Sequence, residues 1–162
     1  MKKFYLALVI LIGVTAVFAQ NPVAKGQTQL NVGLGLSGWG VPVYLGFDHG
    51  IHKDVTIGAE VSFRTINRKH YDDKTVIGIS GNVNYHFNHI LSIPQDWDFY
   101  AGLNIGYYVV SDSDPDDDYY SRLGIAAQIG GRYYFTNTVG VNLEFGGGNA
   151  FSGGKIGLSF KL

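Results

Sequence analysis

The chain of 162 residues contains no cysteine, and charged residues make up only 15% of it. The absence of cysteine excludes disulfide bonds, thiolate metal sites and lipid attachment through a cysteine. The chain has 12 Lys and Arg residues against 13 Asp and Glu residues, a formal net charge of −1. A chain with this charge balance has no excess of basic residues to form the surface that binds nucleic acids, so we expect no nucleic-acid partner.

Long apolar runs are also missing, except for one near the start. This run, 4–18, follows Lys2 and Lys3 and is interrupted by Gly and Thr. It is shorter than the about 20 residues that a membrane-spanning helix needs. The pattern is typical of a secretory signal. We therefore predict that residues 1–19 are a cleaved signal peptide and that 20–162 form a single domain.

Helical periodicity is absent after residue 19, so we expect no helix of any length. Apolar and polar residues instead alternate with a period of two, which is typical of β-strands with one apolar face. Most of the runs approach the about 9–11 residues with which a tilted strand crosses a bilayer. The eight runs are 30–36, 41–48, 55–64, 77–87, 99–109, 123–135, 140–145 and 154–162.

Alternation alone is compatible with a soluble barrel, apolar inside, and with a membrane barrel, apolar outside. The polar face is mostly Gly, Asn, Ser, Gln and Tyr, which is a poor exterior for a soluble barrel. Aromatic residues on the apolar face gather at both strand ends, as in the two girdles of membrane barrels. One group is Phe47, Tyr85, Phe87, Phe99, Tyr133, Phe135 and Phe160, and the other is Phe63, Tyr107 and Phe145. The sequence thus predicts an all-β fold, an eight-stranded antiparallel up-and-down transmembrane β-barrel.

The connections between these strands fall alternately at two ends of the barrel. An even number of strands places both termini at one end, which we expect to be periplasmic. The acidic segment 111–121 then faces the outside. The outward connections are 37–40, 66–74, 111–121 and 146–153, and the periplasmic ones are 49–54, 88–98 and 136–138.

With this pattern the segment 20–162 resembles the small outer-membrane barrels of the OmpA/OmpX type, including the opacity-like surface proteins. The closing run, with Phe160 near the end and Leu162 last, is similar to the C-terminal assembly signal of that class, which usually ends in an aromatic residue. The resemblance implies the outer membrane of a Gram-negative-type cell. Its implied partners are outer-membrane lipid, lipopolysaccharide and the barrel-assembly machinery, reached through the C-terminal strand.

Charged residues on the polar face predict an ion-pair network in the lumen, because buried charges need partners. We expect Glu144 and Lys155 to form a cross-strand pair and Glu60 to meet Arg132 across the lumen. A proton or ion relay is the alternative interpretation. The predicted network consists of Glu60, Arg64, Arg132, Glu144, Lys155 and Lys161.

Two groups of metal-ligand types also stand out, but neither predicts a site. His49, His52, His86 and His89 lie in or beside two periplasmic connections, where imidazoles bind metals or remain solvated. The aspartates of 112–118 lack the glycine and glutamate of a calcium loop. No catalytic set of Ser, His and acid is evident on the apolar face, so we expect neither an enzyme nor a cofactor.

The predicted function is therefore a structural or surface-contact role carried by the extracellular loops. Exposed aromatic residues beside charged loop tips suit contact with a protein or glycan, and these are Trp39, Tyr71, Tyr119 and Tyr120. A narrow porin-like conduit for ions or small solutes is the alternative, followed by a lipid-modifying enzyme. The sequence identifies no extracellular ligand.

Overall fold

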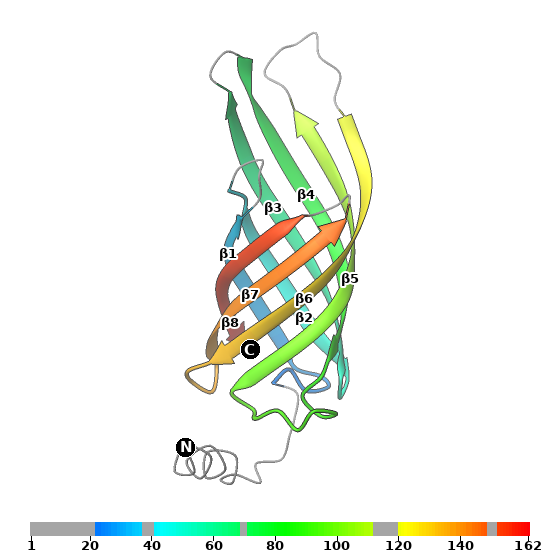
Figure 1. Cartoon of the computed structure of the whole chain (residues 1–162), viewed down its shortest axis with the longest axis vertical. Coiled ribbons are helices and arrows are strands. Elements are labelled where there is room, and N and C mark those ends of the chain that lie inside the picture. The colour runs from blue at the N-terminus through cyan, green and yellow to red at the C-terminus, as the bar shows by residue number, and fades with distance from the viewer. Residues whose placement is uncertain (1–21, 37–40, 69–70, 112–119, 149–151) are drawn as a thin grey trace, which may run out of the picture.

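The computed structural model describes residues 22–36, 41–68, 71–111, 120–148 and 152–162, which form a closed antiparallel barrel (Figure 1). Each strand pairs with the next, and β8 pairs with β1. The strands are β1 (Thr28–Leu36), β2 (Val43–His52), β3 (Val55–Arg68), β4 (Tyr71–His86), β5 (Trp97–Ser111), β6 (Tyr120–Tyr134), β7 (Val139–Gly148) and β8 (Gly153–Lys161). The predicted eight-stranded barrel is confirmed.

The barrel has two ends that we name from its connections. The turn end carries the β2–β3, β4–β5 and β6–β7 connections, and there β1 begins and β8 ends. The loop end is the opposite one. No helix occurs among the described residues, and thus no helix among them could span a membrane. The predicted signal peptide, 1–19, lies outside the described residues.

The side chains follow the predicted alternation. On β5, Leu103 is 63% exposed on the outer surface, whereas Asn104 is 5% exposed in the lumen. The other strands repeat this arrangement, so the exterior is apolar and the interior polar. This is the reverse of a soluble barrel and is the arrangement that lipid requires of a spanning sheet.

Glycines make room for the large tyrosines of the lumen. Tyr100 is buried, and a Cβ atom added to Gly130 would lie 2.3 Å from Cζ of its ring. Gly157 lies under the Tyr44 hydroxyl in the same way, at 2.6 Å. The small residues on the polar face therefore let side chains fill an eight-stranded barrel.

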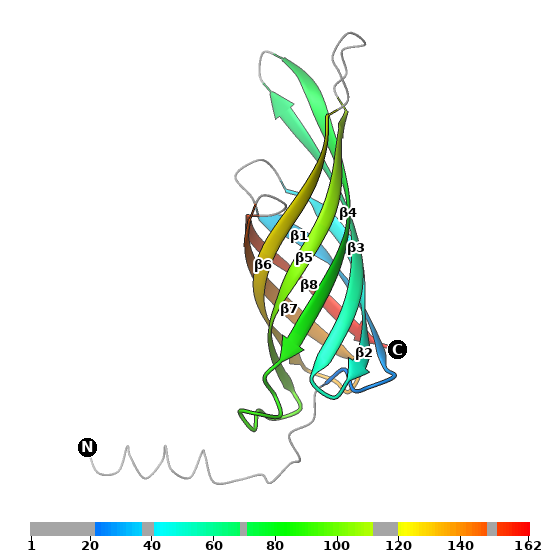
Figure 2. The same ribbon diagram turned by 90° about the vertical axis from the view of Figure 1, so that its right-hand side faces the viewer.

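The wall of the barrel has two heights (Figures 1 and 2). Strands β7, β8, β1 and β2 have 9 or 10 residues and form what we call the low wall. Strands β3 to β6 have 14 to 16 residues and form the high wall, which projects at the loop end.

The predicted connection 146–153 is shorter than expected, because Gly146 pairs with Gly153, and two others shrink further. The predicted connection 66–74 is mostly strand, because Ile66 pairs with Lys74 and Arg68 with Tyr71. The predicted connection 49–54 shrinks to two residues between His52 and Val55. Both segments lack apolar alternation although they are paired, since a strand that leaves the lipid no longer needs an apolar face. The polar sequence of these two segments therefore predicted loops where the structure has paired strands.

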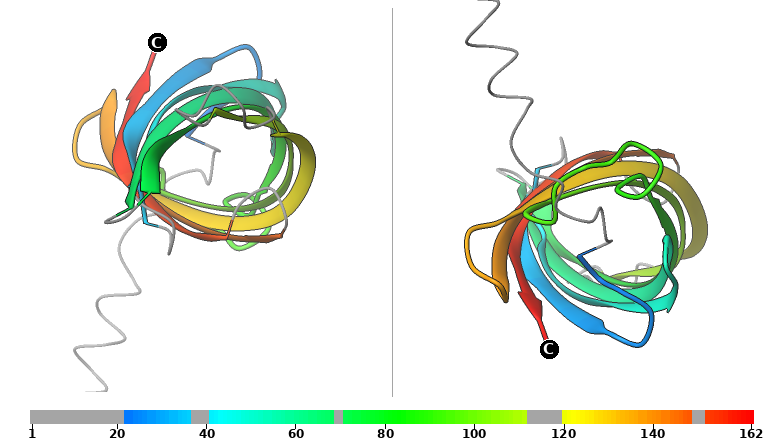
Figure 3. Two further views of the ribbon diagram at one scale, coloured as in Figure 1. Left: turned by 90° about the horizontal axis from the view of Figure 1, so that it is seen from above. Right: turned by 90° about the horizontal axis from the view of Figure 1, so that it is seen from below.

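Residues 22–27 precede β1 and fold against β2 at the turn end, where Figure 3 shows them crossing the mouth of the barrel. The Gly26 N–H donates to the Gly50 carbonyl over 2.7 Å, and the Gly50 N–H donates to the Gln27 carbonyl over 2.9 Å. Val23 is fully buried. This segment thus narrows the turn-end opening.

Candidate functional site: the polar lumen

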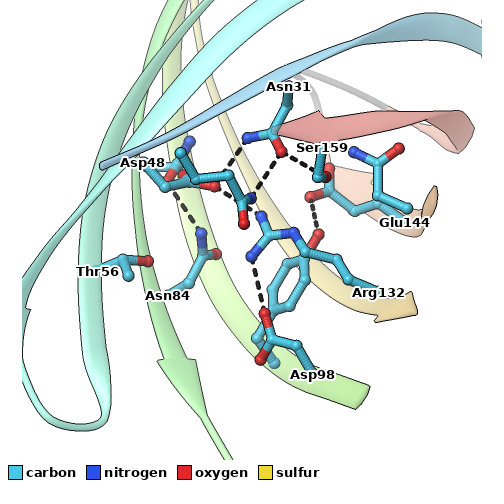
Figure 4. A network of polar contacts seen from close by, with 12 residues as sticks. Asn31, Asp48, Thr56, Asn84, Asp98, Arg132, Glu144 and Ser159 are labelled. Atoms are coloured by element: carbon cyan, nitrogen blue, oxygen red, sulfur yellow. Dashed lines mark hydrogen bonds and ion pairs between the residues drawn. The ribbon is translucent and has the colours of Figure 1, made fainter. Parts of the chain in front are cut away.

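Arg132 on β6 is the centre of a buried charge cluster near the turn end (Figure 4). Its Nη1 lies 2.9 Å from Oδ2 of Asp98 on β5, and its Nη2 lies 2.6 Å from Oδ2 of Asp48 on β2. All three side chains are at most 3% exposed. One guanidinium therefore joins two carboxylates from opposite parts of the wall, the geometry for which Arg is suited.

A hydrogen-bonded chain extends from this cluster along the high wall. The other carboxylate oxygen of Asp98 lies 2.7 Å from Nδ1 of His86, and Nε2 of His86 lies 3.0 Å from the Thr56 hydroxyl. His86 and Thr56 are fully buried. This chain fixes the orientation of the imidazole ring by a bond on each of its nitrogens.

On the low-wall side the cluster continues through amides and hydroxyls. The Asn31 amide donates to Asp48 over 2.9 Å, and the Ser159 hydroxyl donates to Asn31 over 2.8 Å. Gln29 also donates to Asn31 and accepts a bond from the Tyr134 hydroxyl. Burial of these polar groups is thus accompanied by hydrogen bonding, which avoids a large desolvation penalty.

A second cluster lies deeper in the barrel around Lys155 of β8. Its Nζ lies 2.8 Å from a carboxylate oxygen of Glu60 on β3 and 2.8 Å from one of Glu144 on β7. The Tyr100 hydroxyl donates to Glu144 over 3.0 Å, and its ring lies under the Arg132 guanidinium at 4.3 Å. Tyr100 therefore connects the two clusters.

The structure brings together part of the predicted network. Glu144 lies opposite Lys155 in the ladder and contacts it, as predicted. The predicted contact between Glu60 and Arg132 is wrong, because Glu60 contacts Lys155 and Arg132 contacts the two aspartates. The reason is geometric, since the stagger of the strands sets which side chains meet across the lumen.

The remaining two predicted members lie toward the two ends of the barrel. Arg64 is on the same face of β3 as Glu60, two inward positions nearer the loop end, and is half-buried. Lys161 lies at the turn end, where its Nζ is 3.7 Å from the centre of the Tyr134 ring. It therefore takes part in a cation–π contact.

Among the acidic, basic and histidine side chains of the clusters, those not in the predicted site are Asp48, Asp98 and His86. The predicted connection 88–98 includes Asp98, which is instead the second residue of β5 and fully buried. His86 is grouped in the sequence prediction with the histidines of the periplasmic connections. The alternation of β4 already put His86 on the inward face with Asn82 and Asn84, and this was the signal that could have identified it.

The lumen retains a cavity of about 20 Å³ between the two clusters, lined by Asp48, Tyr100, Arg132, Glu144 and Lys155, among others. This volume accommodates about one water molecule. Among the described residues no three His, Cys, Asp or Glu side chains converge as metal ligands would. The aspartates of 112–118 lie outside those residues.

Two of the four predicted surface-contact residues are described, and both lie at the loop end. Trp39 and Tyr119 lie outside the described residues. Tyr71 is the first residue of β4 and Tyr120 the first of β6. Both therefore mark the top of the high wall.

Comparison with solved structures finds the same fold in outer-membrane barrels. OprG from Pseudomonas aeruginosa aligns with a TM-score of 0.63 and 11% identity, over 88% of this chain and 99% of that one. The N-terminal β-barrel domain of OprF from the same organism gives 0.60 and 12%, over 85% and 98%. Ail of Yersinia pestis, in complex with the heparin analogue sucrose octasulfate, gives 0.56 and 11%, over 85% and 99%.

These likenesses confirm, at the level of the fold, the resemblance to small eight-stranded outer-membrane barrels that the sequence indicated. No protein-family model and no curated protein sequence matches the chain.

Proposed function

We propose that the chain is an integral outer-membrane barrel with a filled lumen, whose role is structural or surface contact through its loop end. The apolar exterior and polar interior support the membrane location. In this orientation the turn end and both termini are periplasmic. Its other proposed partners are outer-membrane lipid, lipopolysaccharide and the assembly machinery that reads β8.

The observation that carries this proposal is the pair of charge clusters across the lumen. Arg132 and Lys155 each join carboxylates from two parts of the wall, and the cavity between them has about the volume of one water molecule. A conduit needs a continuous water path, so these clusters favour a plug. Thr56, His86 and Asp98 form a hydrogen-bonded chain, but none of the three lines the cavity, and we propose no catalytic role.

The high wall supports the surface-contact part of the proposal. A strand that only crosses a bilayer needs about 9–11 residues, whereas β4 has 16. The additional paired residues carry the β3–β4 and β5–β6 connections away from the lipid. In sequence, 66–74 contains three basic residues, Arg68, Lys69 and Lys74, against two acidic ones, Asp72 and Asp73. A sulfated glycan, such as the one bound by Ail, is therefore a suitable probe.

Membrane insertion is tested by cell fractionation and by gel migration of boiled and unboiled protein. We expect recovery in the outer membrane and faster migration before boiling, because a closed ladder resists detergent. Recovery in soluble fractions would reject the membrane assignment.

In a planar lipid bilayer the purified barrel should show no stable conductance. Steady single-channel openings would instead support the conduit.

Surface contact is tested by shortening the high wall. Thr65 and Thr75 are paired, so replacing 66–74 with Asn-Gly closes the hairpin there with a favourable two-residue turn. Cells carrying this variant should bind immobilised heparin less than cells carrying the natural barrel, while the gel shift is retained. Equal binding with an intact gel shift would remove the β3–β4 hairpin from the contact surface.

A further inference from the structure

The β4–β5 connection, residues 87–96, has a shape fixed by its own hydrogen bonds. The Leu91 N–H donates to the Phe87 carbonyl over 2.9 Å, which closes one turn. The buried Asn88 side chain donates to the Trp97 carbonyl over 2.5 Å and accepts from the Phe99 N–H over 3.3 Å. The connection is therefore an ordered turn whose hydrogen bonds fix the direction of its side chains.

The side chains at its tip are apolar. Ile90 is 66% exposed and Leu91 is 64% exposed, and the connection projects past the strand ends (Figure 1). In water, two adjacent aliphatic side chains held outward forgo the free energy of burial. An ordered turn that keeps them exposed is typical of a surface that meets an apolar partner.

An aromatic group connects this tip with the apolar exterior of the barrel. The Trp97 ring stacks on Phe99 with centroids 5.7 Å apart, and it lies 4.7 Å from the ring of Tyr133. The Phe87 N–H, at the start of the connection, donates to the Phe99 carbonyl. Aromatic groups of this kind mark the level of lipid headgroups in spanning proteins. The aromatic group and the apolar tip therefore lie at the same end of the barrel.

A cation accompanies the apolar tip. Lys53, in the β2–β3 turn, has a side chain that is 58% exposed, and its Nζ lies 3.4 Å from both ring nitrogens of His89. It also forms an ion pair with Asp54, at 3.7 Å. An exposed ammonium at the same end of the barrel as the apolar tip suits a membrane interface, where headgroup phosphates lie.

We propose that the β4–β5 connection is an interfacial anchor that binds the phospholipid leaflet at the turn end. Ile90 and Leu91 lie at the level of the headgroups, and Lys53 contacts headgroup phosphate. The inference rests on the proposed membrane location and extends it, because it adds a lipid-binding surface outside the spanning strands. Its occupant is phospholipid, chosen for the aromatic group at the adjoining strand ends and for the charge of Lys53.

Environment-sensitive labels on single cysteines test this inference, and the natural chain is suitable because it contains no cysteine. The variants are Ile90→Cys, Leu103→Cys on the outer surface of β5 and Asn137→Cys in the exposed β6–β7 turn. Each is labelled with a nitrobenzoxadiazole dye in vesicles of phosphatidylcholine and phosphatidylglycerol. Position 90 should show blue-shifted emission and quenching by headgroup-level nitroxide lipids. Position 103 should be quenched by deep nitroxides, and position 137 by neither.

The three positions separate the possible failures. If position 90 behaves like 137 while 103 is quenched, the anchor is wrong and the membrane barrel stands. If 103 also behaves like 137, the proposed function itself is rejected. Lys53→Glu should reduce the quenching at 90 in vesicles with phosphatidylglycerol but not in pure phosphatidylcholine. Equal quenching in the anionic vesicles would overturn the role of Lys53.

Discussion

The low wall and the high wall of this barrel are equal at the turn end and different at the loop end. The low-wall strands have 9 or 10 residues, close to the about 9–11 that a bilayer requires. The high-wall strands continue for roughly another four to six residues. On the outer face of the high wall, apolar Phe63 and Ile77 are followed toward the loop end by Thr65 and Thr75. Lipid therefore sets the height of the low wall, and the high wall continues past it.

The two walls are joined in the lumen by the same cations that neutralise its carboxylates. Arg132 connects Asp98 of the high wall with Asp48 of the low wall. Lys155 connects Glu60 of the high wall with Glu144 of the low wall. Each cation therefore braces the tall half of the barrel against the short half.

Removing the Arg132 brace should have the largest effect. Arg132→Ala leaves two buried carboxylates without their shared cation and should lower the free energy of unfolding by about 3–5 kcal/mol. Urea titration of the barrel in lipid vesicles measures this loss. The matched control is Lys161→Ala, which removes a partly exposed cation from the Tyr134 ring and should cost about 0.5–2 kcal/mol. Equal losses in the two variants would mean that Arg132 is not a brace.

Charges on the outer face should locate the level at which the high wall leaves the lipid. Leu103 lies midway between the aromatic residues Phe99 and Tyr107 of β5, whereas Thr65 follows the last apolar outward residue of β3. Leu103→Lys should destabilise the barrel by about 2–4 kcal/mol and Thr65→Lys by about 0–1 kcal/mol. Unfolding in vesicles tests both. A cost at Thr65 as large as that at Leu103 would place the whole high wall in lipid.

The sequence predicted the barrel well because lipid imposes a strict pattern on its strands. Within the bilayer every second residue must be apolar, and the alternation of β5 and β8 shows this directly. Above the bilayer that requirement ends, so the paired residues Ile66 and Lys74 gave no strand signal. The height of the high wall could not be read from the sequence for this reason.

The lumen was predictable in composition but only partly in its contacts. Glu144 and Lys155 lie on neighbouring strands, so alternation and strand order suffice to pair them. Arg132 and Asp48 are 84 positions apart in sequence and on strands that are not neighbours. Which carboxylate meets the guanidinium then depends on the stagger of the closed sheet, which one sequence does not give.

The close packing of Tyr100 on Gly130 provides a smaller test, within the high wall. Gly130→Ala places a methyl group against the ring and should cost about 1–3 kcal/mol of unfolding free energy. Gly147→Ala, on the low wall, is the control because, apart from its chain neighbours, no atom of the described residues lies within 4 Å of the added Cβ. Adding Tyr100→Leu should make Gly130→Ala nearly neutral. A full cost that persists without the ring would assign the effect to the backbone instead.

The smallest effect is expected where residues 22–27 fold against β2 of the low wall. A Cβ atom at Gly50 would lie 2.2 Å from the Ala24 carbonyl oxygen, so Gly50→Ala should displace this segment from β2. Because the segment lies outside the ladder, the free energy of unfolding should fall by at most about 1 kcal/mol. Trypsin cleavage after Lys25 should become faster, since displaced backbone is more accessible. The control is Gly81→Ala, where the nearest atom is 3.7 Å from the added Cβ, and it should leave the cleavage rate unchanged. An unchanged rate in Gly50→Ala would show that the segment does not depend on the contact between Gly50 and Ala24.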